Sequence, residues 1–153
     1  VRNNICDTTG GRSHGCFMVE QRMAEPTTTQ IRVQNNTCYS GEPGQYFSCV
    51  ILGKGVSNIT VQNNLASAPR ATRPRMIVDF GSSGLNQSSN STDTQTLGTP
   101  PGWVQGTPKL PADFRLGPAS PYVDAGIAAP VHSDFFGTPR PRGAKIDPGA
   151  AER

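Results

Sequence analysis

The chain has 153 residues, which fits a single domain, and it combines 34% hydrophobic and 16% charged residues with 17 glycines and 14 prolines. This turn-rich composition favours a β protein over a helical one. A net charge of +3 with scattered arginines does not indicate binding to nucleic acid, and no apolar run approaches the roughly 18 residues that a membrane span needs.

A short motif occurs three times in the first half of the chain. It reads Val-Arg-Asn-Asn at 1–4 and Val-Gln-Asn-Asn at 33–36 and 61–64, and the last two copies have an isoleucine two positions before the valine. The copies begin 32 and 28 residues apart. Each joins an apolar strand of period two to an Asn-Asn turn. A strand-and-turn unit that recurs at such an interval predicts a solenoid.

The paired asparagines have a mechanical interpretation. Asparagine tolerates the left-handed backbone conformation that a sharp corner requires. Its carboxamide can also bond to the same group one coil away. The sequence therefore predicts a structural ladder of Asn4, Asn36 and Asn64 along the stack. Binding of a sugar or a metal by these side chains is the alternative interpretation.

Aligning the three copies places the four cysteines in two columns. Cys6 and Cys38 each follow the asparagine pair, and Cys16 and Cys49 begin the next apolar run, whereas the third copy has alanine and methionine there. The spacing favours Cys6–Cys16 and Cys38–Cys49, each closing the base of a loop. Pairing between coils stays open as an alternative, because stacked strands lie about 4.8 Å apart, which a disulfide can span. Four buried free thiols are the other alternative. Disulfides would place the protein in an oxidising compartment, either secreted, extracellular or periplasmic.

The rest of the chain divides by composition. The coils are expected to occupy residues 1–80. Residues 81–101 are polar and of low complexity, and they are interpreted as a surface excursion or a link. Residues 102–153 are rich in proline and glycine and show no 3.6-residue period. This predicts an irregular segment laid against the end of the stack, with Trp103 among its apolar contacts.

The C-terminal segment carries the most specific pattern. It reads Asp-Phe-Arg-Leu at 113–116, Ser-Pro-Tyr-Val-Asp-Ala-Gly at 120–126, Asp-Phe-Phe-Gly-Thr-Pro-Arg-Pro at 134–141 and Ile-Asp-Pro-Gly-Ala-Ala-Glu at 146–152. This resembles the closing segment of secreted right-handed parallel β-helix proteins of the pectate-lyase-like class. There the pattern runs D-F-R-L, S-P-A-x-D-A-G, D-x-x-G-x-P-R-P and D-I-G-A-x-E. The chain departs from it at Tyr122, Pro148 and Ala151.

The resemblance implies an all-β, right-handed parallel β-helix whose C-terminal segment caps the last coil. The acids of that segment and Arg140 are expected to form internal salt bridges and turn hydrogen bonds. Asp134, Asp147 and Glu152 could instead bind calcium through their oxygens, and no other cofactor is expected. The chain begins inside a coil, so we expect this end to be covered by a partner chain, a symmetry mate or upstream residues.

The resemblance also implies a possible polysaccharide lyase or glycoside hydrolase, whose groove would lie mostly on coils N-terminal to Val1. Candidate contacts to an acidic polysaccharide are Lys54, Arg70, Arg73 and Arg75. Catalytic residues are not assigned, because the acids that a hydrolase would pair fall at unmatched coil positions. These acids are Glu20, Glu25, Glu42 and Asp79. The preferred hypothesis is a non-catalytic extracellular module, a structural or binding subunit of a larger surface assembly.

Overall fold

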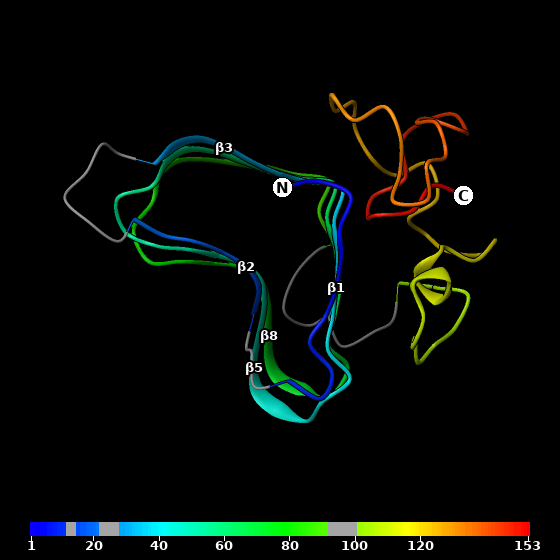
Figure 1. Ribbon diagram of the computed structural model, residues 1–153, viewed down its shortest axis with the longest axis horizontal. Helices are drawn as coiled ribbons and strands as arrows, with labels where there is room; N and C mark the ends of the chain where they lie inside the picture. Colours follow the sequence, from blue (N-terminus) through cyan, green and yellow to red (C-terminus); the bar gives the residue numbers. More distant parts are fainter. Residues whose placement is uncertain (12–14, 22–27, 92–100) are drawn as a thin grey trace.

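The computed structural model describes residues 1–11, 15–21, 28–91 and 101–153, which are drawn in colour in Figure 1. These residues form nine short β-strands and one 3-10 helix, and they contain no α-helix. The strands are β1 (Ile5–Asp7), β2 (Gly15–Val19), β3 (Thr29–Gln34), β4 (Thr37–Tyr39), β5 (Gly44–Leu52), β6 (Ser57–Gln62), β7 (Leu65–Ser67), β8 (Ala71–Asp79) and β9 (Ser83–Ser88), and the 3-10 helix is η2 (Pro111–Phe114).

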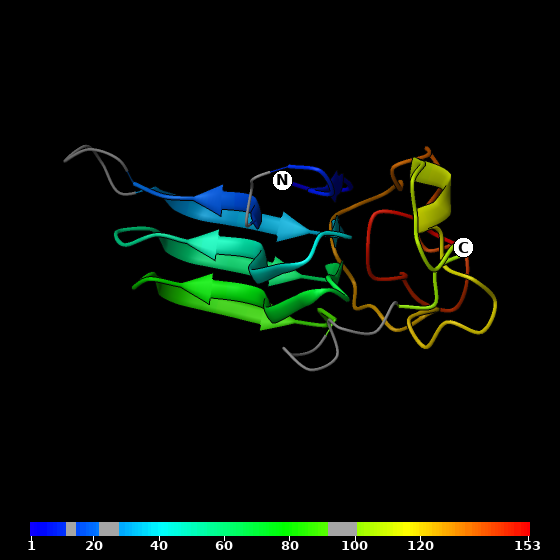
Figure 2. The ribbon, with the colours of Figure 1, turned by 90° about the horizontal axis from the view of Figure 1, so that it is seen from below.

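Every third strand pairs in parallel. The sheets have the orders β1-β4-β7, β2-β5-β8 and β3-β6-β9, so each sheet takes one strand from each coil. The repeated residues lie in register, with Cys6 opposite Cys38 and Val33 opposite Val61. Figure 1 looks along the stack, where the coils overlap, and Figure 2 shows them from the side as three layers. The chain is therefore a parallel β-helix, which is the solenoid that the repeat predicts and the fold class that the resemblance implies.

The corner between the third and first sheets explains the asparagine pairs. The first asparagine of each pair adopts a left-handed conformation, with φ of 55° at Asn3, 53° at Asn35 and 55° at Asn63. Few residues other than glycine adopt this conformation as readily as asparagine. Ser89 makes the same corner after β9, with φ of 48°. The first asparagine thus turns the chain, and the second is free to extend its side chain along the stack.

The interior of the stack is apolar and closed by two disulfides. Its most buried members come from all three sheets and include Val33, Val50, Ile59, Val61 and Ala66, each at most 1% exposed. The disulfides join Cys6 to Cys16 and Cys38 to Cys49. This is the pairing within coils that the spacing favours, and each bond closes the base of one loop.

Part of the predicted excursion at 81–101 belongs to the stack instead. Residues 83–88 form β9, which pairs with β6 along its whole length. A parallel ladder is made by the backbone, so a serine-rich segment can join it when the inward position is apolar, as at Leu85. Gly84 takes the left-handed corner that Asn58 takes in β6. The end of the predicted excursion, residues 92–100, lies outside the described residues.

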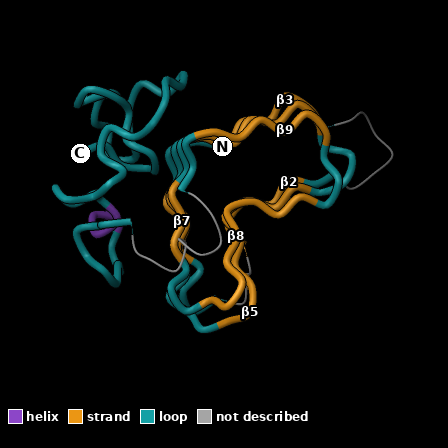
Figure 3. The backbone as a smooth tube through the Cα atoms, turned by 180° about the vertical axis from the view of Figure 1, so that it is seen from behind, coloured by secondary structure: helices purple, strands orange, loops and turns teal. Residues whose placement is uncertain are grey.

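The C-terminal segment lies beside the stack, whereas the sequence predicted that it covers the last coil. Figures 2 and 3 show it as loops next to the sheet that contains β1 and β7. All three residues of β4 and of β7 are buried, so both faces of these strands are covered. Trp103, Phe114 and Leu116 pack on the outer face against Tyr39 and Leu65. Outward apolar side chains on successive coils therefore draw the segment to the side of the stack.

Hydrogen bonds fix this lateral position along the corner. The side-chain nitrogen of Asn35 donates to the carbonyl of Asp147 at 3.3 Å, and that of Asn63 donates to the carbonyl of Ile127 at 2.7 Å. The side chain of Asn3 donates to the carbonyl of Ser133. The first asparagine of each pair thus has a second role, because it ties the C-terminal segment to its coil.

Candidate functional site at the open end of the stack

The second asparagines form the predicted ladder. The Nδ2 atom of Asn4 donates to Oδ1 of Asn36 at 3.0 Å, and Asn36 donates to Asn64 at 2.9 Å. Asn64 donates in turn to Oδ1 of Asn90 at 2.9 Å, which adds a rung that the sequence did not predict. The motif is degenerate there, since 85–90 reads Leu-Asn-Gln-Ser-Ser-Asn. Alignment of Leu85 with the motif isoleucine would have found it.

The ladder has a direction. The backbone N–H of each ladder asparagine also donates to the Oδ1 of the next, as Asn36 does to Asn64 at 3.0 Å and Asn64 does to Asn90 at 2.9 Å. Asn90 donates one side-chain hydrogen to the carbonyl of Val61 at 2.8 Å. Its backbone N–H and its second Nδ2 hydrogen have no acceptor among the described residues. Within residues 1–11, 15–21, 28–91 and 101–153, the ladder therefore ends in two donors without an acceptor at this end of the stack.

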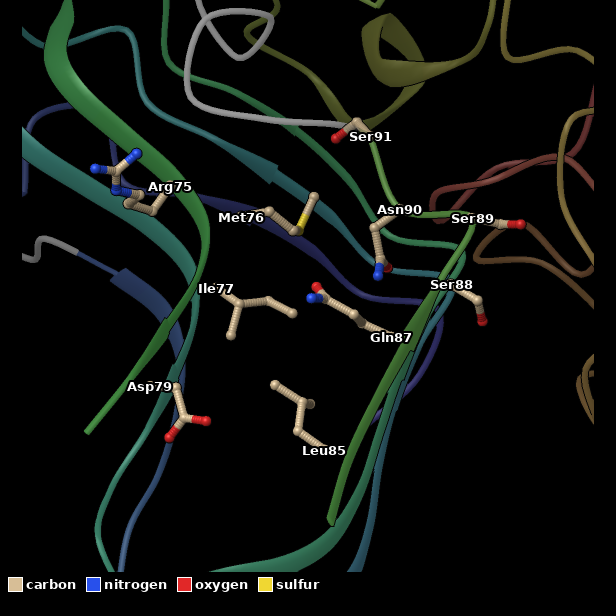
Figure 4. A pocket seen from close by; sticks show the side chains of 10 residues that line it. All are labelled: Arg75, Met76, Ile77, Asp79, Leu85, Gln87, Ser88, Ser89, Asn90 and Ser91. Atoms are coloured by element: carbon tan, nitrogen blue, oxygen red, sulfur yellow. The ribbon is translucent and has the colours of Figure 1, made fainter. Parts of the chain in front are cut away.

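A hollow of about 570 Å³ lies at the same end. Met76, Ile77 and Leu85 point into it in Figure 4. They are the last members of columns that run through the core, because Ile77 lies opposite Val50 and Leu85 lies opposite Ile59. The hollow is thus the end of the apolar interior, and residues 101–153 do not line it.

Polar side chains surround this apolar surface. Gln87 stands in the column of Val61, and its exposed carboxamide reaches across the hollow in Figure 4. Arg75 and Asp79 lie at its β8 side. The Asp79 carboxylate accepts hydrogen bonds from the backbone of Ser82, from its hydroxyl and from the backbone of Gly81, and these hold the pKa of Asp79 below its ordinary value of 3.8. Asp79 therefore fixes the turn that leads into β9.

The last coil also presents strand edges. β7, β8 and β9 each pair with a strand of the middle coil, and within the described part of the chain no strand pairs with their other edge. Unpaired edges of this kind accept a further strand readily. The hollow, the ladder end and the edges of β8 and β9 together form the candidate site, which we term the open end.

The structure brings together some of the predicted polysaccharide contacts. Arg73 and Arg75 are exposed on β8, and Arg70 immediately precedes that strand. The Arg73 guanidinium lies 5.7 Å from the ring centre of Tyr46 and donates to its hydroxyl at 3.1 Å. Lys54 follows the far end of β5 from Tyr46, so it is separated from this group by most of that strand.

Two of the four acids considered for a hydrolase pair make hydrogen bonds. Glu42 accepts the backbone N–H of Gly10, and Asp79 is engaged in its turn. Glu25 lies outside the described residues. Within the described part of the chain, no three His, Cys, Asp or Glu side chains are placed to hold a metal ion.

The acids suggested for calcium are occupied with hydrogen bonds. Asp134 accepts the backbone N–H groups of Phe136, Thr138 and Glu152, and Asp147 accepts those of Asp124 and Arg153. Glu152 pairs with Arg140 at 2.7 Å, with both side chains at most 1% exposed. Burial raises the pKa of Glu152 and lowers that of Arg140. These contacts organise the C-terminal segment.

The fold and the open end define a β-solenoid of the parallel β-helix type. Comparison with protein-family models, with curated proteins and with solved structures found no significant match to this chain. Among the described residues, no helix combines the length and apolar character needed to cross a bilayer. The two disulfides indicate an oxidising, extracytoplasmic environment.

Proposed function

We propose that this chain is a non-catalytic extracellular β-helix module, a structural or binding subunit of a larger surface assembly. Kinship with the pectate-lyase-like β-helix proteins is part of this proposal, and the pattern at 113–152 supports it. The proposal assigns binding to the open end rather than to a catalytic groove.

The observation that carries the proposal is the open end itself. Soluble solenoids normally finish in a coil with a polar outer face. Here Met76, Ile77 and Leu85 line the end, and within the described part of the chain no strand pairs with the strand edges beside them. Burial of such apolar area and pairing of such edges both favour association. The remainder of the stack is tied by its ladder and disulfides, which makes it a rigid support for docking.

The experiment combines turnover with site-directed crosslinking. The purified chain is expected to release no unsaturated product, read by absorbance, from a panel of uronate polymers. A photo-crosslinking residue at Leu85 is expected to capture one product of defined mass from the extracellular fraction of the source cells. The same residue at Phe80, which is 67% exposed and outside the hollow, serves as the control and should capture none. Turnover that is lost in Lys54→Ala or Arg73→Ala would overturn the proposal in favour of a lyase.

A second candidate is binding of an acidic polysaccharide by the outer face of β8. The observation that favours it is the guanidinium of Arg73 beside the exposed ring of Tyr46, with Arg70 and Arg75 on the same strand or next to it. Arginine recognises carboxylates in two-point contacts, and aromatic rings pack on sugars. Binding of polygalacturonate should weaken with salt and in Arg73→Ala, while Arg32→Ala, an exposed arginine of β3, should leave it unchanged.

A further inference from the structure

The open end has the shape of an incomplete repeat. Along the third sheet, Ile31, Ile59 and Leu85 occupy successive coils, and each strand of this sheet leads to a rung of the ladder two residues after it. A strand placed against the free edge of β9 would therefore bring its own side chains to the next position of each column. The columns and the ladder together specify which residue types that strand needs at its inward positions and at its ladder position.

We propose that the open end binds an extended segment of a partner protein with the pattern Ile-x-Val-x-x-Asn, which adds in parallel to β9 and whose asparagine continues the ladder beyond Asn90. This inference rests on the proposed function, because it names the kind of partner that the module docks. The segment contributes backbone pairing, two apolar side chains to the hollow and one carboxamide to the ladder end.

The carboxamide requirement follows from the polarity of the ladder. At each internal step, one Oδ1 accepts both the backbone N–H and the Nδ2 hydrogen of the preceding asparagine, as Asn64 accepts from Asn36. Asn90 presents these same two donors without an acceptor among the described residues. Donors that become buried without a partner are costly, so complementarity selects a partner with a side-chain oxygen at this place.

The apolar requirement follows from the hollow. Leu85 ends the column of Ile31 and Ile59, and Met76 and Ile77 face it from β8. An aliphatic side chain placed next to Leu85 would contact Leu85, Met76 and Ile77, and it would be removed from water. Side chains on an added strand alternate between the two faces, which spaces the apolar positions two residues apart and fixes the Ile-x-Val pattern.

Gln87 is the side chain that discriminates between occupants. It stands where the two preceding coils have Val33 and Val61, and it is exposed. A polar group at an edge discourages pairing with arbitrary apolar strands. Its flexible side chain can turn outward when a matching segment binds, which costs binding free energy. Only a segment that also makes the asparagine contact offsets this cost. Replacement of Gln87 by valine should remove this cost and strengthen binding.

The probe is a blocked fluorescent peptide with the sequence of residues 57–64, Ser-Asn-Ile-Thr-Val-Gln-Asn-Asn, added to the full chain. Anisotropy should show saturable binding. The matched peptide with Asn64→Ala should bind at least tenfold more weakly, because two hydrogen bonds at about 1 kcal/mol each are lost. In the chain, Gln87→Val should strengthen binding several-fold, and Asn4→Ala, at the other end of the ladder, should leave it unchanged.

Amide shifts on peptide titration should concentrate in β9 and β8. Equal binding of the two peptides, or shifts confined to the first coil, would overturn the inference. Self-association that competes with the peptide would also overturn it, since the occupant would then be a second copy of this chain. If no peptide binds while the crosslinker at Leu85 still captures its product, the inference fails and the proposed function stands. If the crosslinker also captures nothing, both fail.

Discussion

The coil stack and the C-terminal segment are two halves built on different principles. In the stack, the same contacts recur from coil to coil, and the polar side chains bond to their own equivalents, as in the ladder of Asn36 and Asn64. In the C-terminal segment no contact recurs, and each buried polar group has its own partner, as Arg140 has Glu152. The segment is almost entirely loop, yet its residues 146–152 are all buried.

This difference determines how much stability each half loses when a residue is substituted. A repeated ladder can be extended or shortened by one rung, so the stack tolerates an open end. A cluster of unlike partners has no such freedom, because removing one member leaves the others buried without a partner. We therefore expect the largest effects of substitution in the C-terminal segment and graded effects along the stack, from its buried to its exposed rungs.

The largest effect is expected for Arg140→Met. The substitution leaves the carboxylate of Glu152 buried without its cation, which should cost about 3–5 kcal/mol of unfolding free energy. The fluorescence of Trp103, the only tryptophan and 6% exposed, should report early loss of this half in urea. The double variant Arg140→Met/Glu152→Met should recover much of the loss. An effect no greater than that of Arg142→Met, at an exposed position, would contradict the comparison.

Next comes the buried rung of the ladder. Asn64→Ala removes the acceptor of the Asn36 backbone N–H and the donor to the Val33 carbonyl, both inside the stack. Two buried groups left without partners should cost about 3 kcal/mol. Urea unfolding followed by circular dichroism measures this. Asn4→Ala is the matched control at the exposed rung and should cost less than about 1 kcal/mol. Equal losses for the two variants would show that the ladder does not bear on stability.

The two disulfides sharpen the comparison between the first and second coils. Each closes a loop, with sequence separations of 10 and 11, so loss of either should cost about 2–3 kcal/mol through the entropy of the unfolded chain. Cys38 and Cys49 are completely buried, whereas Cys6 and Cys16 are half-buried. Limited reduction should therefore open Cys6–Cys16 first, as read by thiol labelling and mass spectrometry. If Cys38–Cys49 opened first, the disulfide of the second coil would be the more accessible one, which contradicts the prediction.

The smallest effect concerns acid. The pKa of Asp79 is lowered by hydrogen bonds from Ser82 and Gly81, so its ionised form stabilises the turn before β9. This contribution is complete above the unfolded value of 3.8 and is lost as the pH falls through the lowered pKa of the folded state. Carboxyl NMR titration should give a midpoint below 3.8, and β9 should lose amide protection in the same range. Asp79→Asn should abolish that acid-dependent step.

The regular half of the molecule could be predicted from the sequence because its contacts repeat in the sequence. Aligning Asn4, Asn36 and Asn64 is sufficient to predict the ladder. The spacing of the aligned cysteines favours the pairing within coils and leaves pairing between coils open. β9 was missed because parallel pairing needs only backbone groups and an apolar inward residue, and Leu85 stands alone among polar neighbours. Composition reports the side chains of a segment and does not report its backbone partners.

The position of the C-terminal segment could not be predicted from the repeat. Its direction depends on Tyr39 and Leu65, which point away from the core. Tyr39 and Leu65 are sequence neighbours of the inward Cys38 and Ala66, so alternation along the strand puts them on the outer face. Apolar side chains there indicate that another segment packs on that face. The open end follows from the same fact. A segment held at the side of the stack does not line the hollow of the last coil.

Amide hydrogen exchange along the third sheet tests the central claim most directly. The claim is that the last coil pairs on one side only. β6 has a strand on each side, so its amides should exchange slowly throughout. β9 has one neighbouring strand among the described residues, so about half of its amides should be protected and the rest should exchange nearly as fast as in an unfolded chain. Uniform protection of β9, equal to that of β6, would contradict the account.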